Sequence, residues 1–138
     1  FDIDELSENK NFSVNTYLSF YRKELKDYTF FRKVVTGMNR TFNKYLLNLG
    51  IKDVNWVKAY KTSELKSLDL KLESSLLGSE ICAKLNVKGT GATEIPSVYH
   101  KRSAGTAKGA SFKNLIKAVT ELLKLTFVIR QFRKDKIN

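Results

Sequence analysis

The sequence is poor in the residues on which thiol and metal chemistry depend. Its 138 residues include one cysteine, Cys82, and one histidine, His100. A single cysteine cannot form an internal disulfide, and a single histidine excludes most histidine-based zinc sites and any pair of histidines acting as acid and base. We therefore expect binding rather than catalysis, and no resident cofactor.

Long apolar runs are also missing. No run approaches the roughly 18 residues that a transmembrane helix requires. Hydrophobic residues nevertheless make up 42% of the chain and aromatic residues 12%, enough to bury a real core. We expect a polar arm over residues 1–12 and a single domain over residues 13–138.

Acidic residues are scarce relative to basic ones. There are 14 of them against 25 lysines and arginines, for a net charge of +11. Residues 84–138 hold 12 of the basic residues and three of the acids, whereas the preceding part is close to neutral. A surplus concentrated in this way indicates a polyanionic partner, and we expect nucleic acid.

Residues 13–50 have the apolar spacing of a helical pair. Apolar residues recur at steps of three and four from Val14 to Tyr28, and Ser13 is a plausible N-cap. A second stripe contains Phe31, Val34, Val35, Met38, Phe42, Tyr45, Leu46 and Leu49. Gly50 is predicted to end this second helix in the left-handed conformation.

Residues 51–100 suggest a short antiparallel β-meander. Residues 53–61 fit either a strand or a helix capped by Asp53, while 67–74 and 80–88 alternate apolar and polar side chains as strands do. The short connection at Gly78 predicts a hairpin between them. Residues 94–100 are a third candidate, in which Pro96 indicates an edge strand.

The remainder is predicted to be a basic loop followed by a helix. Residues 101–110 are small, flexible and basic, and Ser111 is placed to cap a long helix over residues 111–134. The resulting fold class is α+β: an N-terminal helical pair, a short antiparallel β-meander and a long C-terminal helix.

Nucleic-acid contacts are predicted in the basic second half. Glycines at 89, 91, 105 and 109 would let the backbone approach phosphates, which lysine and arginine side chains bind. The side chains expected to contact phosphate are Lys84, Lys88, Lys101, Arg102 and Lys108, with help from Arg130, Arg133 and Lys134, while Tyr99 could stack on a base. The choice between DNA and RNA stays open.

A nuclease is the first alternative. Asp53 followed by the triplet Asp69–Leu70–Lys71 resembles the PD-(D/E)xK nuclease pattern over about twenty residues, although Lys52 stands where that pattern has proline. The resemblance implies magnesium held by Asp53 and Asp69, with Glu24 as a further ligand, and Lys71 stabilising phosphate charge. A small basic ribonuclease or toxin domain using His100 beside Lys101 is the metal-free version.

A structural or assembly protein is the second alternative. Aromatic side chains are abundant over residues 13–49, and Phe20 and Phe30 fall outside the main stripes, so these helices could form a homo-oligomer. The frequent lysine and asparagine suggest an AT-rich genome, such as that of a virus or mobile element. An intracellular location, in the cytoplasm or nucleus, suits a nucleic-acid partner.

Overall fold

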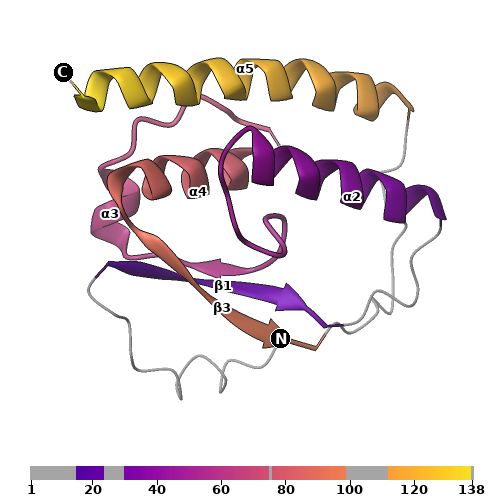
Figure 1. The fold of residues 1–138 in the computed structure, drawn as a ribbon, viewed down its shortest axis with the longest axis horizontal. Helices are drawn as coiled ribbons and strands as arrows, with labels where there is room; N and C mark the ends of the chain where they lie inside the picture. Colours follow the sequence, from indigo (N-terminus) through magenta and orange to yellow (C-terminus); the bar gives the residue numbers. More distant parts are fainter. Residues whose placement is uncertain (1–14, 24–29, 75, 99–111, 138) are drawn as a thin grey trace.

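The computed structural model describes residues 15–23, 30–74, 76–98 and 112–137. Its elements, in chain order, are β1 (Thr16–Arg22), α2 (Phe30–Tyr45), β2 (Lys58–Ala59), α3 (Thr62–Lys66), α4 (Leu77–Lys88), β3 (Gly91–Ser97) and α5 (Phe112–Ile137). Figure 1 shows the sheet on one side, α4 and α2 above it, and α5 as the outermost layer. The predicted arm at 1–12, the caps Ser13 and Ser111, and the basic loop at 101–110 lie outside the described residues.

The sheet is mixed, with strand order β2-β1-β3. β1 pairs antiparallel with β2 and parallel with β3, in a register that sets Tyr17 opposite Ala92 and Phe20 opposite Ile95. The predicted antiparallel meander is therefore wrong. The parallel partner of β1 follows it by some seventy residues, and the helices α2, α3 and α4 occur in between.

The helix predicted from Ser13 to Tyr28 is also wrong, because its described part contains the central strand β1. Four consecutive residues of β1, from Tyr17 to Phe20, are buried. Tyr17 packs into the cluster shared with the helices, whereas Leu18 and Phe20 pack with Ile95 in a second cluster. A strand covered on both faces does not need the alternation of apolar and polar residues that identifies strands. The apolar residues of β1 happen to have the spacing of a helix, which led to the wrong prediction.

Residues 80–88, predicted as a strand, belong to helix α4. All seven residues from Ser79 to Leu85 are buried, so this part of the helix is enclosed on every side. A helix enclosed in this way does not need to gather its apolar residues in one stripe. The alternation of apolar and polar residues over 80–88 therefore led to the wrong prediction of a strand. Gly89 ends the helix in the left-handed conformation, with φ of 87°.

The strand predicted over residues 67–74 is wrong: Ser67 ends α3 in a helical conformation, and residues 68–74 form no strand, although their burial alternates as predicted. Leu68 and Leu72 are buried while Asp69 and Lys71 are exposed. The carboxylate of Glu80, on α4, accepts hydrogen bonds from the backbone amides of Lys71 and Leu72, both at 2.9 Å. A side chain thus satisfies the amides that a neighbouring strand would otherwise bind.

Four other predictions are confirmed in part. The second apolar stripe does form a helix, α2, but Asn48 and not Gly50 adopts the left-handed conformation after it, with φ of 55°. Helix α5 occupies the predicted C-terminal position, and β3 is an edge strand that contains Pro96. Between residues 53 and 61 the strand is reduced to Lys58–Ala59.

Candidate nucleic-acid interface

The C-terminal ends of α4 and α5 lie together and are basic. Lys136 of α5 donates a hydrogen bond to the carbonyl of Val87, next to Lys88 at the end of α4, at 2.7 Å. Lys88 donates to the hydroxyl of Ser67 at 2.6 Å, and Arg133 to the carbonyl of Leu47 at 3.4 Å. These acceptors are neutral, so they orient the cations without cancelling their charge.

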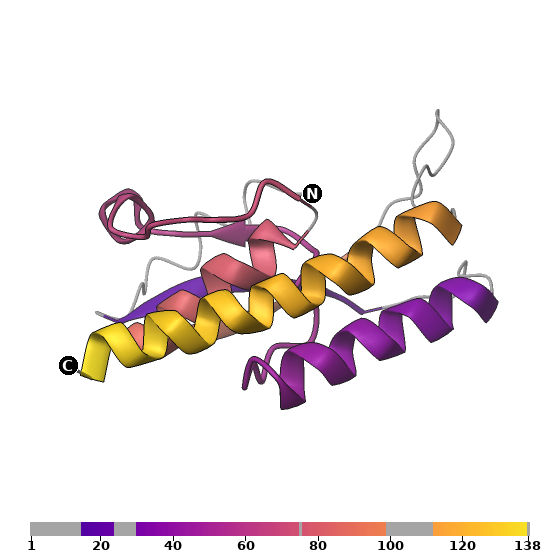
Figure 2. The ribbon, with the colours of Figure 1, turned by 90° about the horizontal axis from the view of Figure 1, so that it is seen from above.

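Two further cations lie on the outward face of α5. Arg130 and Lys134 are exposed and one turn apart, on the side of the helix opposite the buried Leu125 and Ile129. We call Lys88, Arg130, Arg133, Lys134 and Lys136 the basic end. Figure 2 shows the two helices that carry it, with α5 running across α4.

Four of the eight acids among the described residues form ion pairs elsewhere. Their ion pairs join Arg22 to Asp53, Lys52 to Glu94, Lys71 to Asp69 and Lys84 to Glu80, and none of these pairs includes a cation of the basic end. Asp135 is exposed and is the one acid between Arg130 and Lys136. The basic end therefore keeps a positive field that a polyanion would meet.

Lys84, predicted to contact phosphate, lies inside the protein. Its side chain is 2% exposed and pairs with the fully buried carboxylate of Glu80 at 2.6 Å. The ammonium also donates to the carbonyl of Asp69 and lies 5.2 Å from the ring centre of Phe132. In this position it supports the fold and does not reach the surface.

The remaining predicted contacts fall outside the described residues. They are Tyr99, Lys101, Arg102 and Lys108, together with His100 of the alternative ribonuclease site. The same holds for Glu24, the additional ligand of the nuclease alternative. From the predicted set, the structure places Lys88 at the end of α4 and Arg130, Arg133 and Lys134 in the C-terminal part of α5, and it adds Lys136, which contacts the end of α4.

Lys136 was not singled out from the sequence. It is one of several lysines near the C-terminus, and its significance comes from its contact with the end of α4. A cation in the last turn of a long helix was the available signal, since such positions interact favourably with the helix dipole. The contact itself joins residues 49 positions apart, which local patterns do not reveal.

The acids of the nuclease alternative are engaged separately. Asp53 accepts a hydrogen bond from Arg22 at 2.7 Å, and both side chains are largely buried. Asp69 pairs with Lys71 at 2.6 Å on the surface, and this lysine lowers the pKa of the aspartate. Among the described residues, no group of three or more histidine, cysteine or acidic side chains is arranged to hold a metal ion.

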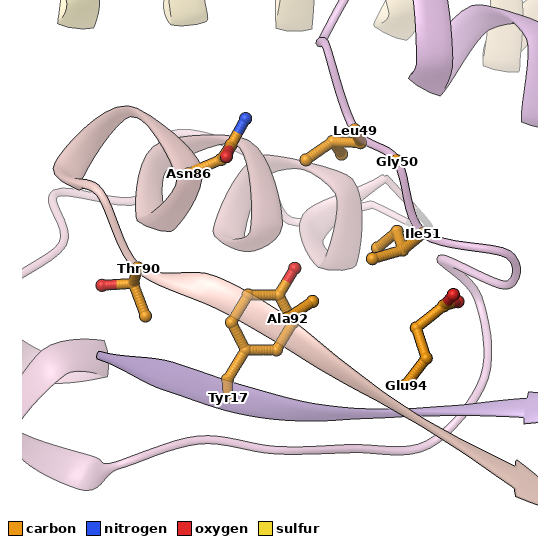
Figure 3. A pocket seen from close by; sticks show the side chains of 8 residues that line it. All are labelled: Tyr17, Leu49, Gly50, Ile51, Asn86, Thr90, Ala92 and Glu94. Carbon is orange, nitrogen blue, oxygen red and sulfur yellow. The ribbon is translucent and has the colours of Figure 1, made fainter. Parts of the chain in front are cut away.

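A small cavity lies between the sheet, α4 and the segment after α2 (Figure 3). It measures about 210 Å³, and its polar lining includes Tyr17, Asn86, Thr90 and Glu94. Asn86 donates to the carbonyl of Asn48 at 3.0 Å, and Glu94 accepts from the Lys52 amide at 2.7 Å. These groups hold the chain segment in place, and the volume is below the usual range for a ligand site.

The phenols of Tyr17, which is buried, and Tyr60, which is partly buried, are unsuited to acid–base chemistry. The rings of Tyr17 and Tyr60 lie 5.3 Å apart, and the Tyr60 hydroxyl is 3.6 Å from the sulfur of Cys82. Burial, reinforced by Cys82, raises the pKa of both tyrosines far above the ordinary value. Both phenols stay protonated near neutral pH.

In the part of the chain that the structure describes, no helix combines the length and apolarity needed to cross a bilayer. Comparisons of the chain with protein-family models, with curated proteins and with solved structures gave no match. The functional argument therefore rests on the geometry and charge described above.

Proposed function

We propose that this protein binds nucleic acid inside the cell through the basic end of α4 and α5. The observation that supports it most is the way the cations there are held within the described part of the chain: the partners of Lys88, Arg133 and Lys136 are neutral oxygens of Ser67, Leu47 and Val87. Cations held in this way can exchange a weak neutral contact for a charge-assisted bond to phosphate. The predicted contacts Lys101, Arg102 and Lys108 lie outside the described residues and stay predictions.

The test is a binding titration of the full chain against single- and double-stranded DNA and RNA at several salt concentrations. Binding through phosphates weakens steeply with salt, because each neutralised phosphate releases counterions. The variant Arg130→Ala/Lys134→Ala should bind more weakly and reduce the log–log salt slope by about 2. Both side chains are exposed, so the fold should survive.

The matched control is Lys44→Ala/Lys71→Ala, which removes the same charge from exposed positions on other elements. It should leave the slope nearly unchanged. The proposal fails if neither DNA nor RNA is bound at low salt, or if the control weakens binding as much as the Arg130 and Lys134 pair. Magnesium-dependent cleavage abolished by Asp69→Ala would favour the nuclease alternative instead.

A further inference from the structure

Part of the apolar stripe of α2 faces away from the core, although Phe42 of the same stripe packs against the core cluster. Val34, Met38 and Tyr45 are 43%, 59% and 75% exposed, and Leu46 just beyond the helix is 48% exposed. The side that faces the protein carries Asn43, which is 1% exposed and donates to the carbonyl of Asn39 at 2.7 Å. An amphipathic helix on the surface of a globular domain normally buries its apolar side. Here Val34, Met38 and Tyr45 stay uncovered by the described residues.

A row of cations runs along the helix beside this stripe. Lys33, Arg40 and Lys44 are all exposed and lie seven and four residues apart, so they share one side of α2. The helix contains no acidic residue. The ammonium of Lys44 lies 5.6 Å from the ring centre of Tyr45, where the basic row meets the apolar stripe.

The apolar stripe and the row of cations beside it together limit the kinds of partner that α2 could bind. Nucleic acid would use the cations, but the aliphatic Val34 and Met38 contribute nothing to phosphate contacts and would not need exposure for that purpose. A second copy would cover the stripe, yet it would bring two acid-free basic helices together and incur like-charge repulsion. An anionic bilayer surface can bind both sets of side chains. Its headgroups attract the cations, and the boundary between headgroups and acyl chains accepts the apolar side chains.

We propose that α2 binds an anionic lipid surface, lying flat with Val34, Met38 and Tyr45 inserted and with Lys33, Arg40 and Lys44 at the headgroups. Tyrosine suits this depth because its ring is apolar and its hydroxyl polar. The 16 residues of α2 form a segment about 24 Å long. This helix would lie in the plane of the membrane interface and would not cross the bilayer. This surface is separate from the basic end, so the inference does not depend on the proposed function.

The test is co-sedimentation of the full chain with vesicles of phosphatidylcholine alone and of phosphatidylcholine mixed with phosphatidylglycerol. We expect binding to the mixed vesicles and much less to the neutral ones. Met38→Asp should weaken binding at least about tenfold, since inserting an apolar side chain of this size contributes roughly that factor. Lys33→Ala/Arg40→Ala/Lys44→Ala should weaken binding to the mixed vesicles and leave the residual binding to neutral vesicles unchanged.

Leu123→Asp is the matched control, because Leu123 is 70% exposed on the outward face of α5. It should leave vesicle binding intact, and circular dichroism with thermal unfolding should show every variant folded. Equal vesicle binding by Met38→Asp and the unaltered chain would overturn the proposal. So would a dimer that Met38→Asp dissociates in the absence of vesicle binding, or nucleic-acid binding that Met38→Asp abolishes without any vesicle binding.

Discussion

Glu80 and Lys84 form a buried ion pair that organises the residues around it. The carboxylate accepts hydrogen bonds from two backbone amides and the ammonium donates one to a backbone carbonyl, so α4 holds the segment 67–74 in place. A buried charge without its partner is costly, because neither water nor an opposite charge stabilises it. The spacing of four residues fits a pair on one helix face, but the same spacing is common on exposed helices, so it did not indicate that Lys84 is buried.

Replacing Lys84 tests this role. Lys84→Met leaves the carboxylate of Glu80 buried without a counter-ion, and we expect the free energy of unfolding to fall by about 3–5 kcal/mol. Urea denaturation measures the loss. Lys71→Met is the control: its side chain is 54% exposed, so removing that surface pair should change stability by less than about 0.5 kcal/mol. Equal losses in the two variants would contradict the assignment.

At the scale of elements, burial on all sides is what misled prediction from the sequence. β1 and α4 are both enclosed, and an enclosed element has no need for a one-sided apolar pattern. α2 is the opposite case: its strong stripe correctly indicated a helix, but not which side of that helix faces the protein. Local patterns therefore predicted α2 and α5 correctly, but they predicted a helix in place of β1 and a strand in place of α4.

Two glycines allow a paired test of the helices. Gly89 ends α4 with a positive φ, so a Cβ there is strained, and Gly89→Ala should cost about 1–2 kcal/mol. Gly37 lies inside α2, and a methyl group would meet no atom within 4 Å. Gly37→Ala should therefore stabilise the protein by about 0.5–1 kcal/mol. The midpoint of thermal unfolding of each variant tests this prediction. Shifts of the two midpoints in the same direction would contradict the helix assignments.

For the whole molecule, the buried phenols link stability to alkaline pH. Tyr17 on β1 and Tyr60, which follows β2, meet Cys82 on α4, so they lose their buried environment only when the sheet and helix layers separate. Their pKa is raised in the folded state, whereas an unfolded tyrosine ionises near 10.0. Above that pH the unfolded chain releases protons that the folded chain keeps, so stability falls as pH rises.

We expect a decrease of about 1.4 kcal/mol per pH unit for each tyrosine above pH 10. Burial lowers the pKa of Lys58 from 10.5, which acts in the opposite direction up to that pH, so the slope is best measured above it. Urea denaturation from pH 10.5 to 11.5 should show a shallower slope for Tyr17→Phe/Tyr60→Phe. Tyr45→Phe, at a 75% exposed position, should leave the slope unaltered; a change there would point to general charge repulsion.

The sequence by itself determined the charge surplus, the helical character of α2 and α5, the alternating burial over residues 68–73 and the edge position of the strand containing Pro96. Each of these follows from local composition or spacing. Only the tertiary structure decided that β1 is the central strand with a parallel partner, that Lys84 is buried against Glu80, and that Val34, Met38 and Tyr45 of α2 face outward. These features depend on which distant segments meet, and contacts such as that of Lys136 with Val87 leave no local trace in the sequence.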